Sequence, residues 1–254
     1  MKLTFSGNRA LILGGTCELG VFLAKEMIKA GLFPILTYRN ENGYKNILKQ
    51  LQSVKGKYDT FYLDFTDRLS LKSLFSGIHD DLDFLVDFVQ GNFENLVASA
   101  DCDAVYRYFE ENISFRAEIL KMVARAMLKK KRGRLVFISS AAATRPNPGQ
   151  GFYAASKLAS EALYKNLGLE LGSRGITTVT LRPGYIDAGR GKKYLQIKKD
   201  GPLCAVPVKR AVTCKELTET VLFFLSDSSR TFNAVEISMD GGLTSGKQNF
   251  LGRV

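Results

Sequence analysis

Three side chains near the middle of the chain have the types and the spacing of a proton-transfer site. Tyr153 and Lys157 are four residues apart, so on a helix both side chains lie on one face and can converge on one group. The lysine ammonium is expected to favour the phenolate and to lower the tyrosine pKa from its free value of about 10. Ser140, at the end of a predicted strand, would donate a hydrogen bond to a carbonyl oxygen beside the phenol. Together the three residues predict general acid catalysis on a carbonyl group.

Each of these residues also has an ordinary structural role, so the catalytic interpretation depends on a glycine-rich turn upstream. A predicted strand ends at Leu13 and continues through residues 14–20, Gly-Gly-Thr-Cys-Glu-Leu-Gly, into a predicted helix. Glycines let the backbone approach a pyrophosphate, whose charge then meets the N–H groups of the helix N-terminus. The alternative is a turn without a ligand. A nicotinamide held here would supply hydride to the carbonyl carbon while Tyr153 supplies the proton.

The second predicted strand ends in Thr-Tyr-Arg-Asn, without the acidic residue that would bind the ribose hydroxyls of NAD. Arg39 stands where a 2′-phosphate would lie, and a guanidinium can hold a phosphate with two parallel charge-assisted bonds. Arg39 therefore favours NADPH over NADH. The alternative is a surface arginine without a ligand.

Short apolar segments alternate with longer amphipathic ones along the chain, a pattern typical of β-α units around a parallel sheet. We predict one domain over residues 1–254, a three-layer, doubly wound α/β fold of the Rossmann-like kind. The expected strands are residues 9–13, 34–38, 60–63, 84–89, 134–139, 177–181 and 235–239, and the clearest helices are 18–30, 104–128, 153–171 and 215–225. Residues 187–209 are expected to form an irregular loop that is functional or mobile.

Composition excludes several classes of protein. The chain has 254 residues, of which 45% are hydrophobic, so it is neither disordered nor a coiled rod. Four scattered cysteines and one histidine predict neither disulfides nor a metal site, which favours a reducing, cytoplasmic compartment. No apolar segment approaches membrane-spanning length, and the net charge of +11 favours acidic partners. Nucleic acid is not expected, because no recognition helix, stacking platform or zinc module accompanies the charge.

These motifs resemble the short-chain dehydrogenase/reductase family over essentially the whole chain. The glycine turn is similar to the family's T-G-x-x-x-G-x-G, and the Tyr153/Lys157 pair is similar to its Y-x-x-x-K, with Ser140 at the usual distance of 13 residues before the tyrosine. Asn112 resembles the helix asparagine that in this family helps to hold a proton-relay water beside the lysine. The resemblance implies that Asn112, Ser140, Tyr153 and Lys157 are the catalytic residues.

The resemblance also implies where NADPH binds. Residues 63–67 contain an aspartate similar to the one that contacts adenine, and residues 182–187 resemble the Pro-Gly turn beside the nicotinamide. The implied cofactor-binding residues are Gly14, Thr16, Leu19, Gly20, Arg39, Asp64, Phe65, Tyr153, Lys157, Pro183, Gly184 and Ile186.

Three departures from the family pattern concern the cofactor site. Glu18 replaces the middle glycine of the phosphate-binding turn, where its carboxylate would compete with the cofactor phosphates for the positive end of the helix. Residues 87–91, Asp-Phe-Val-Gln-Gly, stand in place of N-N-A-G, and Ala188 replaces a threonine that commonly binds the nicotinamide carboxamide. The four catalytic positions are nevertheless complete, which favours an enzyme.

Within the family, residues 147–153 and 173–177 most resemble 3-oxoacyl-(acyl-carrier-protein) reductases, whose carrier is acidic. Lys131 and Arg174 match residues that dock the carrier beside the active-site entrance, and the cations of residues 129–134 and 187–209 would extend the positive field. A solvated helix end is the alternative for the lysine run.

The leading hypothesis is thus an NADPH-dependent reductase of a 3-oxoacyl thioester. One alternative is a reductase of a free ketone, quinone or sugar. The other, motivated by the three departures, is a non-catalytic NADP(H)-binding regulator or scaffold. The family resemblance further implies a homotetramer or homodimer joined through the tyrosine-bearing helix.

Overall fold

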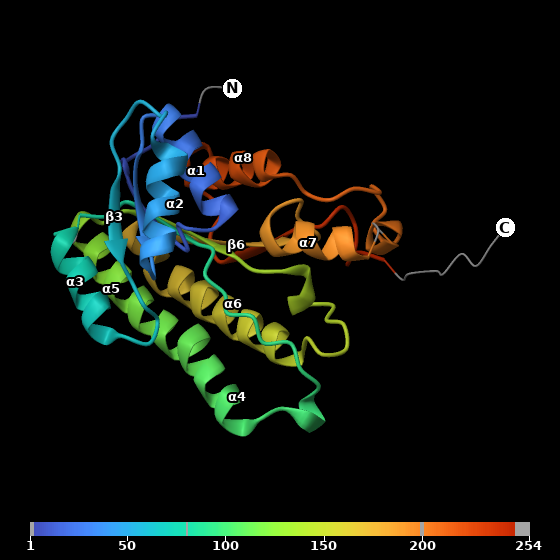
Figure 1. Cartoon of the computed structure of the whole chain (residues 1–254). Coiled ribbons are helices and arrows are strands. Elements are labelled where there is room, and N and C mark those ends of the chain that lie inside the picture. Colours follow the sequence, from blue (N-terminus) through green and yellow to red (C-terminus); the bar gives the residue numbers. More distant parts are fainter. Residues whose placement is uncertain (1–2, 80, 199–200, 247–254) are drawn as a thin grey trace.

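Parallel strands form one seven-stranded sheet in the computed structural model, which describes residues 3–79, 81–198 and 201–246 (Figure 1). The strands are β1 (Arg9–Leu13), β2 (Phe33–Tyr38), β3 (Asp59–Tyr62), β4 (Phe84–Asp87), β5 (Gly133–Ile138), β6 (Ile176–Pro183) and β7 (Val235–Met239). Their order is β3-β2-β1-β4-β5-β6-β7, so the direction of winding changes between β1 and β4. Doubly wound folds bind ligands outside the carboxyl ends of the strands at such a switch point. The predicted fold class is confirmed.

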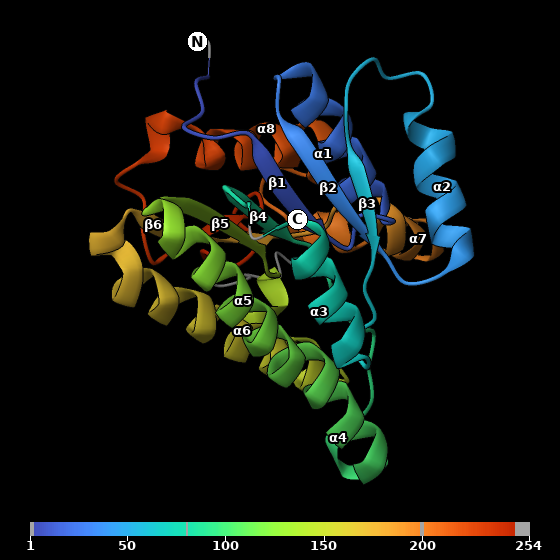
Figure 2. The same ribbon diagram turned by 90° about the vertical axis from the view of Figure 1, so that its left-hand side faces the viewer.

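Helices cover both faces of the sheet (Figures 1 and 2). One face carries α1 (Glu18–Lys29), α2 (Glu41–Leu51) and α8 (Cys214–Leu225), and the other carries α3 (Arg68–Gly77), α5 (Phe115–Lys130) and α6 (Gly151–Leu171). Strands buried on both faces are apolar at consecutive positions. In β1, for example, Ala10 and Ile12 join one core cluster while Leu11 and Leu13 join the other, all at 0% exposure.

The helix predicted over residues 104–128 is interrupted in the structure. It consists of α4 (Cys102–Phe109) and α5, joined by a π-helical turn at Glu110–Ser114 in which the N–H of Phe115 donates to the carbonyl of Glu110. Such a turn inserts one residue into a helix and is frequent at functional sites. The sequence analysis did not predict this turn.

The prediction that residues 187–209 are irregular is wrong for much of that segment. It contains α7 (Gly189–Ile197) and a 3₁₀ helix at Gly201–Ala205, while residues 199–200 lie outside the described part. Two glycines and several lysines in this stretch hide the helical signal. Gly191 is needed for packing, because a Cβ there would lie 2.4 Å from the carbonyl oxygen of Ile186. Leu195 anchors the helix with 5% exposure.

Candidate active site

The structure brings Ser140, Tyr153 and Lys157 together at the carboxyl end of β5. Ser140 lies two residues beyond the strand, and the other two lie in the first turns of α6. The Nζ atom of Lys157 donates to the carbonyl oxygen of Ile138 at 2.7 Å and lies 5.9 Å from the centre of the Tyr153 ring. A side-chain hydrogen bond joins Ser140 to the tyrosine. The three residues can therefore act on one substrate oxygen.

The electrostatics of this trio differ from the sequence-based expectation. Burial raises the pKa of Tyr153, and the hydrogen bond to Ser140 and the charge of Arg190 oppose that rise only in part. Burial, followed by the charge of Arg116, lowers the pKa of Lys157 to about 7. The Lys157 side chain donates to a main-chain carbonyl and is only partly protonated at neutral pH. Tyr153 thus keeps its proton at neutral pH, as a general acid must.

Asn112 lies at the centre of the π-helical turn and is buried. Its Oδ1 accepts from the N–H of Gly91 at 2.8 Å, and its Nδ2 donates to the carbonyl of Tyr108 at 2.8 Å. The main-chain carbonyl of Asn112 accepts a hydrogen bond from Arg116. The relay role that the family resemblance implies for Asn112 stays a prediction.

Arg116 and Asp87 form a buried pair that the sequence analysis did not identify. Both side chains have 0% exposure, and the Nε–Oδ2 distance is 2.8 Å. The sequence did contain a signal: Arg116 falls between Phe115 and Ile119 on the apolar face of a helix, where a charge needs a buried partner. That partner is the first residue of the segment that replaces N-N-A-G.

The glycine turn after β1 has the close packing that a pyrophosphate site requires. A Cβ at Gly15 would lie 2.6 Å from the Cβ of Leu36, and one at Gly20 would lie 2.7 Å from the carbonyl oxygen of Gly14. Gly14 itself has a φ of 77°, in the left-handed region. Thr16 and Leu19 are partly exposed along the turn. The N-terminus of α1 therefore presents its backbone closely to a ligand, and this turn fits a dinucleotide.

Two residues expected to bind the adenosine end contact each other. The Nε of Arg39 lies 3.1 Å from Oδ2 of Asp64, while 63% of the arginine side chain remains exposed. Partial burial raises the pKa of Asp64, but hydrogen bonds from Thr66 and the charge of Arg39 outweigh it and lower the pKa overall. Phe65 stacks on Phe115 with ring centroids 5.0 Å apart. The guanidinium is thus held at the end of β2 with a free surface toward solvent.

The turn after β6 packs against the end of β7. A Cβ at Gly184 would lie 3.0 Å from the Cα of Asp240, and Ile186 forms a bridge with Val212. Pro183 is buried as the last residue of β6. These contacts fix the segment that is expected to lie beside the nicotinamide.

The N-terminus of α7 makes hydrogen bonds to two loops at the carboxyl ends of the strands, the glycine turn after β1 and the loop after β4. Glu18 accepts a hydrogen bond from the N–H of Gly189 at 2.9 Å. Arg190 donates to Oδ1 of Asn92 at 3.1 Å and to the carbonyl of Gln90 at 3.3 Å. The carboxylate in the glycine turn therefore contacts the helix that follows β6, and α7 bridges the glycine turn and the loop after β4.

Lys131 and Arg174 lie close together but not beside the active site of the same chain. A Cβ at Gly175 would lie 2.5 Å from the carbonyl oxygen of Lys131. Both cations precede strands β5 and β6, whereas Ser140 follows β5, and a strand of this length spans roughly 20 Å. Within one chain the two cations thus lie at the other end of the strands from Ser140, and their docking role stays a prediction.

Part of the neighbouring positive charge is neutralised. Lys130 and Arg132 each lie 3.0 Å from Oδ1 of Asp83. Burial raises the pKa of Asp83, but hydrogen bonds from Asn8 and Lys130 lower it overall. Lys131 is thus a more available cation than its neighbours for an acidic partner.

Two further observations concern the described residues alone. None of their helices is long and apolar enough to cross a membrane. Within that same part of the chain, no cluster of three or more His, Cys, Asp or Glu side chains could hold a metal ion.

Comparison with known proteins identifies relatives in sequence and in fold. The sequence profile of the short chain dehydrogenase family matches residues 8–198. The 3-oxoacyl-(acyl-carrier-protein) reductases of Salmonella typhimurium and Escherichia coli are 31% and 30% identical over 244 residues, which is 95% of this chain and 99% of each of theirs. Among solved structures, actinorhodin polyketide ketoreductase with NADPH has a TM-score of 0.87 at 25% identity, covering 96% of this chain and 100% of that one. NAD⁺-bound xylitol dehydrogenase, at 22% identity and a TM-score of 0.86 over 94% of this chain and 99% of that one, is similar in fold.

Proposed function

We propose that this chain, which belongs to the short-chain dehydrogenase/reductase family, reduces 3-oxoacyl thioesters carried on an acyl carrier protein. We propose further that it uses NADPH. The observation that carries the proposal is the convergence of Ser140, Tyr153 and Lys157 at the carboxyl end of β5, on the same side of the parallel sheet as the close-packed glycine turn that follows β1. A substrate carbonyl at this point would accept a hydrogen bond from Ser140 and a proton from Tyr153.

The chain's own residues account for the proton in this reduction. Ser140 would hold the substrate oxygen, and Tyr153, whose pKa is raised by burial, would give its proton to that oxygen. Lys157 lies within reach of the tyrosine ring and would stabilise the phenolate as it forms. A bound NADPH supplies the hydride. The product is the 3-hydroxyacyl thioester.

The choice of NADPH rests on the end of β2. The residues that would hold the dinucleotide are those of the glycine turn, the Arg39 and Asp64 pair and the turn after β6. Arg39 offers an exposed guanidinium at the position where NAD-selective sites carry an acidic residue. A 2′-phosphate would compete with the carboxylate of Asp64 for this guanidinium.

The acyl carrier would bind through Lys131 and Arg174. These cations lie at the amino ends of β5 and β6, whereas Ser140 follows the carboxyl end of β5, so we propose that a second copy of the chain brings them beside an active site. The proposal therefore includes a homodimer or homotetramer.

The decisive experiment is a substrate panel. Oxidation of NADPH is followed with acetoacetyl-carrier protein, acetoacetyl-CoA, and free ketones, quinones and sugars at increasing salt concentration. We expect the highest kcat/KM with the carrier-bound thioester and a loss of that advantage with salt, since charge steering is screened. Preference for a free carbonyl would redirect the assignment to another substrate. Binding of NADPH without any turnover would indicate the regulator.

A further inference from the structure

The buried pair of Arg116 and Asp87 needs an explanation beyond stability. Removing two charges from water is costly, and apolar residues of similar size often replace buried ion pairs without loss of stability. Here the carboxylate oxygen that contacts Arg116 also accepts a hydrogen bond from the hydroxyl of Tyr164 at 3.0 Å. The anion is thus fully partnered, and Arg116 is held in one orientation.

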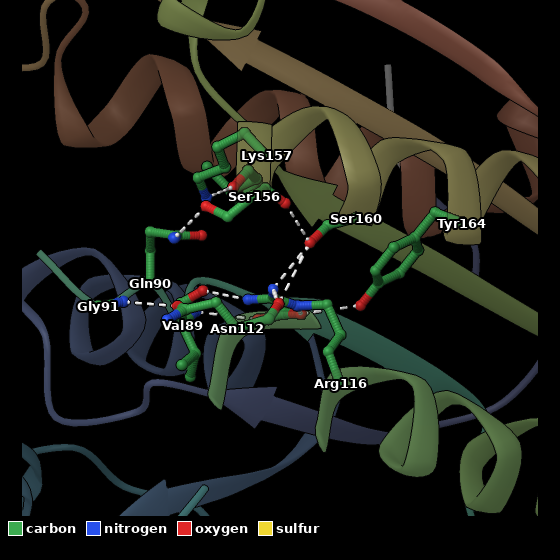
Figure 3. A network of polar contacts seen from close by, with 11 residues as sticks. Val89, Gln90, Gly91, Asn112, Arg116, Ser156, Lys157, Ser160 and Tyr164 are labelled. Atoms are coloured by element: carbon green, nitrogen blue, oxygen red, sulfur yellow. Dashed lines mark hydrogen bonds and ion pairs between the residues drawn. The ribbon is translucent and has the colours of Figure 1, made fainter. Parts of the chain in front are cut away.

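The remaining nitrogens of Arg116 reach three separate elements of the site (Figure 3). Nη1 donates to the main-chain carbonyl of Asn112 in the π-helical turn, and also to Oγ of Ser160 at 2.8 Å. Nη2 donates to the carbonyl of Val89 in the loop after β4. Ser160 lies on α6, three residues after Lys157. One guanidinium therefore joins the turn, the loop and the catalytic helix.

The loop after β4 is fixed in turn by the same network. The side-chain Nε2 of Gln90 donates to Tyr108 at 2.7 Å and to Ser156 at 2.9 Å, and the N–H of Gly91 donates to Asn112 at 2.8 Å. The loop is thereby tied to α4, to α6 and to the π-helical turn.

We propose that Arg116 is a positioning residue of this active site, whose guanidinium aligns the Asn112 turn and the loop at residues 89–91 with the helix that carries Tyr153 and Lys157. This inference rests on the proposed reductase function.

The same charge affects how the site responds to pH. The charged groups that influence Lys157 are Arg116 and Arg190, which disfavour its ammonium, and Asp87 and Glu161, which favour it. After burial, Arg116 has the largest effect and Asp87 the next, so neutralising this pair would raise the pKa of Lys157. Removing the charge of Arg116 is therefore expected to shift the pH dependence of kcat, and the charge-keeping variant Arg116→Lys is not.

Two variants separate the charge of Arg116 from its shape. Arg116→Lys keeps the charge but cannot reach all the acceptors, because an ammonium lacks the fork of a guanidinium. The double variant Asp87→Asn/Arg116→Val removes both charges and leaves neither unpaired. Arg125→Lys and Arg125→Val, at an exposed position of α5, are the matched controls.

The assay measures kcat and KM with acetoacetyl thioester between pH 5.5 and 9, together with hydrogen exchange of residues 89–92. We expect Arg116→Lys to lower kcat about tenfold with little change in KM, and the double variant to move the alkaline limb of the kcat profile to higher pH. Exchange at residues 89–92 should accelerate in both variants and in neither control. Folded Arg116 variants with wild-type kcat, pH profile and exchange would overturn the proposal. If wild type reduces no carbonyl, the proposed function fails, and exchange still decides whether Arg116 positions the loop.

Discussion

The preference for NADPH can be tested at one side chain, Arg39, because its contacts define what a 2′-phosphate would gain. A hydrogen bond to a charged group contributes about 1.5–3 kcal/mol. Arg39 is 63% exposed and already contacts Asp64, so screening and competition place its contribution at the lower end, about 1.5 kcal/mol. That figure corresponds to about a tenfold change in kcat/KM for NADPH.

The assay compares kcat/KM for NADPH and NADH in wild type, Arg39→Ala and a control, Lys45→Ala. Lys45 lies on α2, and its ion pair with Glu41 is exposed on both sides. We expect Arg39→Ala to lose about tenfold with NADPH, to change little with NADH, and to lose less at high salt. A wild type that uses NADH as well as NADPH, or an unchanged ratio in Arg39→Ala, would refute the reasoning.

Three further predictions concern the glycine turn, the cations proposed to dock the carrier, and the start of α8. Glu18→Gly should tighten NADPH binding about two- to fivefold in a fluorescence titration, because a carboxylate leaves the helix N-terminus; weaker binding would mean that its bond to Gly189 matters more. Lys131→Glu combined with Arg174→Glu should lower kcat/KM about tenfold for the carrier-bound thioester and leave the CoA thioester unchanged, and equal losses would exclude a docking role. Thr213→Ala removes the capping box of α8 and should lower the free energy of unfolding by about 1 kcal/mol in urea denaturation, with kcat unaffected.

Local patterns predicted the fold well. The bounds of β1 and β7 agree with the sequence prediction, since their apolar residues are flanked by turn-forming residues. The glycine turn was predictable for the same reason: strand, glycines and helix are consecutive. Ser140, Tyr153 and Lys157 could be placed together because parallel strands put their carboxyl ends at one edge.

Features that depend on distant contacts could not be predicted in the same way. The pKa of Tyr153 depends on how deeply the fold buries it, and the position of the lysine charge depends on the Ile138 carbonyl. The Arg116–Asp87 pair joins residues 29 positions apart, and no local pattern links them. The N-cap residue of α7, Ala188, has no side chain that can cap the helix, and the carboxylate that contacts its first N–H comes from the distant Glu18, so its start has no local sequence signal.

The most direct test of the account is the rate of NADPH oxidation with acetoacetyl-carrier protein by wild type and Tyr153→Phe, with NADPH binding measured for both. A general acid contributes about 10²–10⁴-fold, so the variant should lose at least 100-fold in kcat while still binding NADPH. A Tyr153→Phe protein that binds NADPH and reduces the thioester at the wild-type rate would contradict the assignment of Tyr153 as the acid.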